Sequence, residues 1–95
     1  MMNLQDFFSG DQPLQSKKIL NPSESVITMN IKTGGLLKEH ITVIPALLIC
    51  VTGEIVFEDE HGKSEILLPA DIINIEPQVK HRVVAKKDSL LLLIK

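Results

Sequence analysis

Short apolar runs separated by Pro, Gly and Asp turns follow one another from residue 25 to the end of the chain. In residues 26–32, Ile27, Met29 and Ile31 fall on one face and polar side chains on the other, which predicts a half-buried strand. Residues 47–51 are apolar throughout, as is typical of a strand covered on both faces. The same alternation of runs and turns predicts further strands at residues 36–44, 55–58, 64–68, 72–75, 81–85 and 89–94.

About eight short strands without a long helix predict an all-β domain, a small antiparallel sandwich or barrel. Ninety-five residues leave room for one domain. We assign residues 25–95 to the barrel and residues 1–24 to an N-terminal arm. The arm contains one helical turn with Leu4, Phe7 and Phe8 on one side, and a short edge strand at residues 17–20 that Asn21-Pro22 ends.

Two segments share one plan, and each carries one histidine. Residues 34–53 (GGLLKEHITVIPALLICVTG) contain His40, and residues 69–85 (PADIINIEPQVKHRVVA) contain His81. Because side chains alternate along a strand, His40 and Thr42 share a face and Glu39 points to the other. We predict that the two imidazoles face one another inside the barrel.

The first segment resembles the first motif of the cupins. Gly34, His40 and Gly53 fall on the first Gly, the first His and the closing Gly of that motif with no change of length. Thr42 stands at its second His position and Ala46 at its Glu position.

The second segment resembles the second cupin motif. His81 falls on its His, and Asp71 matches the Asp that commonly follows its first Gly. Elsewhere the chain departs from the motif: Ala70, Glu76, Gln78 and Ala85 stand where the motif has Gly, Pro, Gly and Asn. The resemblance covers residues 28–94 and implies a cupin-type double-stranded β-helix, a small antiparallel jelly-roll barrel.

The resemblance also implies a divalent metal ion, held in cupins by the two His and the Glu of the first motif and the His of the second. Carried over by position, only His40 and His81 remain as ligands, an incomplete set. Catalytic zinc sites generally use three protein ligands. Glu54 and Glu76 are the nearest carboxylates by sequence. Two interpretations stay open: the histidines are hydrogen-bonded barrel residues, or they weakly hold zinc, nickel, iron or manganese.

We predict a small-molecule-binding barrel, because apolar linings with a few polar groups are typical of ligand sites. The alternative is a metal-dependent enzyme of the dioxygenase, isomerase or decarboxylase type that the resemblance implies, so catalysis is left open. A third interpretation is a structural or regulatory subunit. The predicted site has apolar lining residues Met29, Ile31, Leu48 and Phe57 and polar anchors His40, Thr42 and His81.

Composition adds partners and location. Apolar residues make up 44% of the chain, more than a small barrel hides inside itself, which predicts a homodimer. A net charge of −2 argues against nucleic-acid binding, and the apolar runs are too short to span a membrane. The single cysteine, Cys50, predicts a reducing, cytoplasmic setting and a small buried side chain. The N-terminus lacks the features of a signal peptide.

Overall fold

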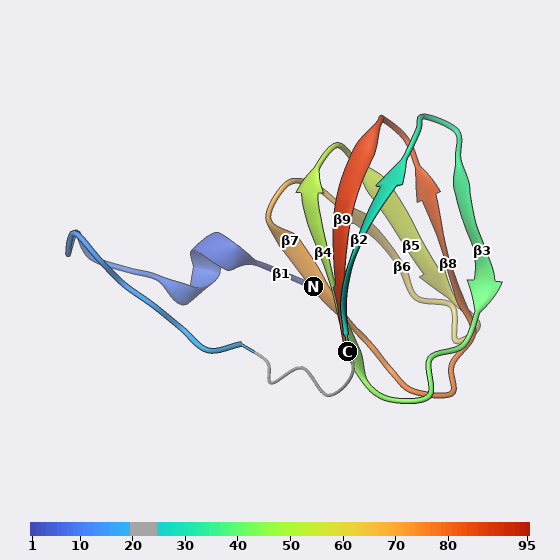
Figure 1. The fold of residues 1–95 in the computed structure, drawn as a ribbon, viewed down its shortest axis with the longest axis horizontal. Coiled ribbons are helices and arrows are strands. Elements are labelled where there is room, and N and C mark those ends of the chain that lie inside the picture. Colours follow the sequence, from blue (N-terminus) through green and yellow to red (C-terminus); the bar gives the residue numbers. More distant parts are fainter. Residues whose placement is uncertain (20–24) are drawn as a thin grey trace.

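The computed structural model describes residues 1–19 and 25–95, with residues 39 and 40 described by their backbone only. In these ranges antiparallel strands form two sheets that pack face to face (Figure 1), so the prediction of an all-β jelly-roll barrel is confirmed. The elements are β1 (Met2–Asn3), the 3-10 helix η1 (Leu4–Phe7), β2 (Val26–Ile31), β3 (Leu36–His40), β4 (Ala46–Thr52), β5 (Ile55–Asp59), β6 (Ser64–Leu67), β7 (Asp71–Ile75), β8 (His81–Ala85) and β9 (Ser89–Ile94).

The two sheets differ in size. Sheet A has the strand order β1-β7-β4-β9-β2, and sheet B has the order β3-β8-β5-β6. The consecutive strands β2 and β3 are therefore edge strands of different sheets, joined by one turn. We call the side of the barrel where these two edges lie the seam; the turn that joins β2 to β3 is at its upper end in Figure 1.

An aliphatic core fills the space between the sheets. Strands β8 and β9 alternate buried and less buried positions along their length, as a strand with one face on a core requires. Leu48, Ile55, Phe57, Leu67 and Leu91 are at most 2% exposed and belong to one cluster. Burying side chains of this size contributes roughly 1.5–3 kcal/mol each to folding.

Most predicted strands match the observed ones within a residue, but the strand predicted at residues 36–44 is shorter. Strand β3 ends at His40, and β8 begins at His81, which lies opposite His40. Residues 41–44 therefore have no neighbouring strand to pair with. Thr42 instead accepts a hydrogen bond at its backbone oxygen from the backbone N–H of Gln78 (2.9 Å), which joins two loops.

The N-terminal segment is tied to sheet A. Met2 and Asn3 form β1, which pairs with Ile72 and Asp71 of β7. The sequence pattern did not predict β1. The predicted helical turn is present as η1, whose N-cap is Asn3. In the same described ranges, no helix has the length and apolar content needed to cross a membrane.

The edge strand predicted at residues 17–20 is not formed by Lys17, Lys18 and Ile19, which have no regular structure. Ile19 packs its side chain against sheet A instead. Leu20 and the Asn21-Pro22 stop lie outside the described residues.

Candidate functional site

The ladder between β3 and β8 places the backbones of His40 and His81 opposite one another. Leu37 pairs with Val83, and the register then shifts by one residue before His40 pairs with His81. Such a bulge inserts one extra residue into a strand and re-aims the side chains beyond it. Without the shift, Glu39 would stand opposite His81. The backbone thus brings the two predicted histidine positions together, and only the His81 side chain lies in the described part.

His81 is buried and held from two sides. Its side chain belongs to a residue that is 2% exposed, and its ring stacks on Phe57 with centroids 5.6 Å apart and planes at 22°. Nδ1 lies 3.2 Å from the backbone oxygen of Val79. Because a carbonyl only accepts hydrogen bonds, a neutral His81 carries its proton on Nδ1 and its lone pair on Nε2.

Thr42 lies at the same end of the barrel, two residues after His40. The residue is 3% exposed, and its Oγ1 has no hydrogen-bond partner among the described residues. A buried hydroxyl without a partner costs about 1–3 kcal/mol of stability. We call this end of the barrel, where β3 ends and β8 begins, the histidine end; it is the lower end in Figure 1.

The corner that precedes β8 adds backbone strain to this end. Gln78 has a φ of 65°, in the left-handed region that side chains with a Cβ rarely adopt. It stands at the second glycine position of the resembled motif. Ala70, at the first glycine position, likewise has a φ of 73°. The chain therefore holds residues with a Cβ in left-handed backbone at both corners where the resembled motif has glycine.

A hollow of about 470 Å³ opens at the seam between β2 and β3. The predicted lining residues Met29 and Ile31 line it, together with Leu37 on the facing strand. All three pack against the core cluster. Leu37 pairs with Val83 before the bulge that precedes the His40–His81 pair. The described lining residues lie on the clasp side of that bulge. Asn30, Lys32, Gly35 and Leu36 complete its lining.

The other two predicted lining residues lie deeper. Leu48 and Phe57 are 1% and 2% exposed and belong to the close-packed cluster that Met29 and Ile31 border. Phe57 still reaches the site through its stack on His81. Leu48 is a core residue and does not line the hollow.

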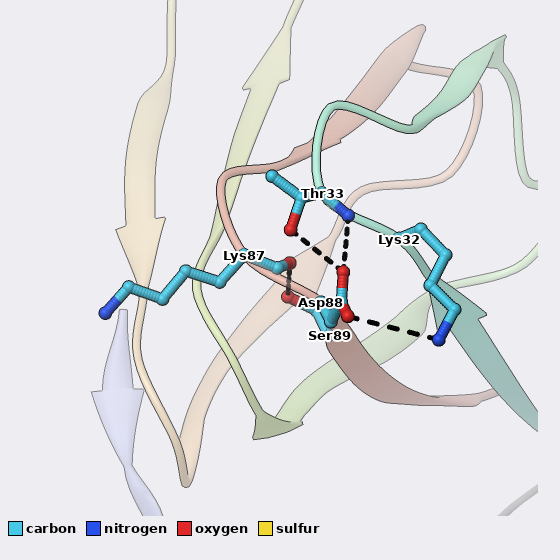
Figure 2. A network of polar contacts seen from close by, with 5 residues as sticks. All are labelled: Lys32, Thr33, Lys87, Asp88 and Ser89. Carbon is cyan, nitrogen blue, oxygen red and sulfur yellow. Dashed lines mark hydrogen bonds and ion pairs between the residues drawn. The ribbon is translucent and has the colours of Figure 1, made fainter.

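Polar contacts close the opposite end of the barrel, which we call the clasp end. There the turn after β2 meets the turn between β8 and β9 (Figure 2). Asp88 Oδ1 accepts hydrogen bonds from both the backbone N–H and the hydroxyl of Thr33, each 2.8 Å long. These bonds lower the pKa of the Asp88 carboxyl, with a smaller contribution from Lys32. Lys32 also lines the seam hollow, so the clasp fixes one rim of that hollow.

The described side chains do not fit a resident metal ion. They contain no group of three His, Cys, Asp or Glu side chains that could hold one. Ala46, at the Glu position of the motif, is 4% exposed and part of the core. Glu76 is exposed, and Glu54 lies at the clasp end, where its backbone oxygen accepts from Lys86 N–H.

Cys50 is fully buried in the core. Burial raises the pKa of its thiol, and the nearby charge of Asp71 raises it further. A thiol with a raised pKa is a poor nucleophile, in agreement with the interpretation of Cys50 as a small buried side chain.

Comparison with known proteins identifies this jelly-roll barrel as a cupin fold. No family model and no curated protein matches the sequence. A cupin superfamily protein from Desulfitobacterium hafniense DCB-2 superimposes with a TM-score of 0.67 at 18% identity, over 81% of this chain and 82% of that one. The cupin domain of Drosophila melanogaster CENP-C gives 0.67 at 23%, over 78% and 63% of the two chains.

Some of the similar structures are described as enzymes. A predicted oxalate decarboxylase from Thermotoga maritima gives a TM-score of 0.65 at 19% identity, over 73% of this chain and 62% of that one. At such identities the likeness concerns the fold. The chain is thus a small cupin-fold barrel, and its chemistry has to be argued from its own residues.

The clasp and most of the lining of the hollow were not predicted from the sequence. Asn30 and Lys32 alternate with the predicted lining residues Met29 and Ile31 and were expected on the other face of that strand. Leu36 was not assigned to the site. They line the hollow because β2 and β3 are both edge strands, so the hollow lies at the rims of the sheets rather than between their faces. The glycine pair at residues 34–35, which brings these two strands into succession, was the available signal.

Proposed function

We propose that this protein is a small-molecule-binding barrel. Its ligand enters the seam hollow between β2 and β3 and extends toward the histidine end. Met29, Ile31 and Leu37 give the ligand an apolar wall. At the histidine end, the ring of His81 stacks on Phe57 and would offer the ligand an imidazole edge. A ligand that fits this arrangement is a small, partly apolar molecule with one hydrogen-bonding group.

The observation that carries the proposal is the buried hydroxyl of Thr42, which has no partner among the described residues. Buried polar groups are nearly always hydrogen-bonded in native proteins, and each exception calls for an explanation. A ligand that bonds to this hydroxyl removes its desolvation cost. The predicted anchors His40 and His81 flank the same end through their backbone pairing.

The test compares the wild-type protein with Thr42→Val, which keeps the shape of the side chain and removes the hydroxyl. We expect the ligand-free variant to gain about 1 kcal/mol in unfolding free energy, since an unpaired buried group is lost. We also expect it to lose the thermal stabilisation that short-chain alcohols, amides or hydroxy acids give the wild type, because a ligand that binds only the native state raises its melting temperature.

Thr28→Val is the matched control. The Thr28 hydroxyl donates to the backbone oxygen of Leu91 (3.2 Å), so its removal loses a bond and leaves stability unchanged or lower. A Thr42→Val protein that is less stable than the wild type, or that keeps the full ligand response, contradicts the proposal.

The alternative function, a metal-dependent cupin enzyme, is favoured by one observation, the opposition of His40 and His81 across the β3–β8 ladder. Two imidazoles fall short of the three ligands that catalytic zinc sites generally use. Elemental analysis of protein purified without a histidine tag tests it. Stoichiometric zinc, nickel, iron or manganese that disappears in His81→Ala supports the enzyme, and protein without metal rejects it.

The proposal includes a homodimer in a reducing, cytoplasmic setting. The excess of apolar residues supports the dimer, because sheet B is partly polar outside while sheet A is apolar on both faces. The buried free thiol of Cys50 is compatible with a reducing compartment.

A further inference from the structure

The outer face of sheet A is apolar and carries no charge. Strand register places Leu47, Ile49, Ile72, Leu92 and Ile94 on this face, and they form a second hydrophobic cluster. The remaining outward positions that pair with them are Val26, Thr28, Asn30, Asn74 and Leu90. A face with no charged residue on four strands is unusual for a surface that meets water.

The N-terminal segment of the chain covers this face only in part. Leu4, Phe7 and Ile19 pack onto the cluster. Beside them a hollow of about 200 Å³ remains open, and Ile49, Val51 and Leu92 contribute to its lining. Val26, Val51 and Leu90 stay 57%, 37% and 37% exposed. The uncovered part is thus continuous with a contact that this chain already makes with its own apolar side chains.

The arm formed by residues 8–19 extends outward on the side of sheet A, away from sheet B (Figure 1). It carries apolar side chains into solvent, since Leu14 is 86% exposed and Phe8 is 42% exposed. The side-chain hydrogen bonds described within the arm are local ones, from Gln15 to the backbone oxygen of Ser9 and to Gln12. Ordering this segment loses conformational entropy, and Leu14 and Phe8 are not buried in return.

We propose that a second copy of this chain covers the outer face of sheet A, and that the arm of each copy lies on the sheet of the other with Leu14 over the open hollow. One chain carries both the projecting apolar side chain and the apolar hollow, as a self-complementary two-fold interface requires. The open hollow beside Leu4 is lined by uncharged residues, which favours an apolar side chain as its occupant; Lys17 and Lys18 lie at a neighbouring hollow of the same face. The inference names the surface of the proposed homodimer and does not depend on the ligand.

Sedimentation velocity over a concentration series tests the surface. A specific dimer buries about 800 Å² on each partner, and a charge buried in its centre without a partner is costly. We expect Leu14→Asp and Leu90→Asp each to raise the dimer dissociation constant at least tenfold. Both residues are exposed in the single chain, so the monomer remains folded, which its melting curve verifies.

Ile66→Asp is the matched control. Ile66 is 54% exposed on β6 of sheet B and receives the same substitution, and its dimer is expected to match the wild type. A wild-type protein that stays monomeric at all concentrations overturns the homodimer itself. A dimer that resists both sheet A variants, or that Ile66→Asp dissociates, overturns the assigned surface and leaves the homodimer standing.

Exchange of the arm has a separate readout. A spin label on Leu14→Cys, in a Cys50→Ala background, is mixed with isotope-labelled protein that carries no spin label. We expect relaxation broadening at the amides of Ile49, Val51 and Leu92 in the isotope-labelled copy. Broadening confined to β6 or β3, or no broadening in a dimeric sample, rejects the exchange.

Discussion

The clasp end and the histidine end of the barrel each bury a side-chain hydroxyl, and they treat it in opposite ways. Ser89 at the clasp end is 1% exposed. Its hydroxyl donates to the backbone oxygen of Lys87 (2.7 Å) and accepts from the backbone N–H of Glu54 (3.1 Å). Thr42 at the histidine end is 3% exposed, and its hydroxyl has no partner among the described residues.

The two ends can also be compared at one backbone corner each. At the clasp end, Gly53 supplies the positive φ of 94° that its turn requires. At the histidine end, Gln78 holds a positive φ with a full side chain. Ala70, in the turn that leads into β7 beside Cys50 and the clasp end, also has a positive φ, so the clearer difference is the Thr42 hydroxyl, which has no partner among the described residues. A satisfied end maintains the barrel, whereas a buried polar group left without a partner is typical of a place kept for binding.

The largest expected effect breaks the clasp end at Gly53. A Cβ at this position meets the Ser89 hydroxyl and the backbone oxygen of Asp88 at distances that real Cβ atoms do not adopt, and the positive φ adds strain. We expect Gly53→Ala to lower the unfolding free energy by about 3 kcal/mol or more, measured by urea denaturation. Gly62→Ala is the control, since it has a similar φ and open space around it. Equal losses in the two variants contradict the close-approach explanation.

Ser89→Ala sharpens the comparison of the two hydroxyls. Its removal leaves the buried N–H of Glu54 without the acceptor it uses, so we expect a loss of about 1–3 kcal/mol. Thr42→Val is expected to change stability with the opposite sign. Urea denaturation of both variants at one pH measures the difference, and the same sign in both variants removes the distinction between the ends.

The strained corners give a smaller effect in the stabilising direction. Placing an L-residue in the left-handed region costs roughly 1–2 kcal/mol, and Ala70 and Gln78 both do so. Glycine also loses more entropy on folding, so we expect Ala70→Gly and Gln78→Gly each to stabilise by at most about 1 kcal/mol. Val43→Gly, on an exposed loop residue, is the control and is expected to destabilise slightly. A destabilised Ala70→Gly protein shows that its side chain is worth more than the strain.

Most of the fold was predictable from the sequence, because each β-strand buries one face and turn residues mark its ends. The strands at residues 81–85 and 89–94 were predicted as apolar runs between turn residues and are present as β8 and β9, and the resemblance to the cupin motifs implied the jelly-roll topology. The end of β3 was not predictable, since it depends on where β8 begins rather than on residues 41–44 themselves. Strand β1 was missed because two residues give no periodic signal.

The site was predictable only in part. Motif spacing identified His40 and His81, but the bulge that opposes them is a property of the ladder and leaves no mark in the alternation. The predicted lining residues Met29, Ile31, Leu48 and Phe57 all lie in or against the core cluster. Only Met29 and Ile31 line the seam hollow. Which interior residues border open space depends on how the sheet edges close, and that is decided by contacts distant in sequence, such as Thr33 with Asp88.

The smallest expected effect is the response of the clasp to pH. Hydrogen bonds from Thr33 hold the pKa of Asp88 below its usual value in the folded protein, so the ionised carboxylate stabilises the fold at neutral pH. This contribution is fully present above the ordinary pKa of an aspartate, about 3.9, and is lost as pH falls through the lowered value. Urea denaturation of wild type and Asp88→Asn at pH 7 and in steps below pH 4 measures it. We expect Asp88→Asn to be less stable at pH 7, with the difference shrinking in acid.

Two further variants separate the causes at Asp88. Thr33→Val removes one of the two hydrogen bonds and is expected to reduce the pH dependence. Lys32→Ala removes an exposed ion pair with a 4.0 Å separation and is expected to change it less, because surface ion pairs contribute little and the Lys32 charge is the weakest of the influences on this carboxyl. If Lys32→Ala has the larger effect, the ion pair between Lys32 and Asp88 rather than the hydrogen bonds of Thr33 holds the two turns together.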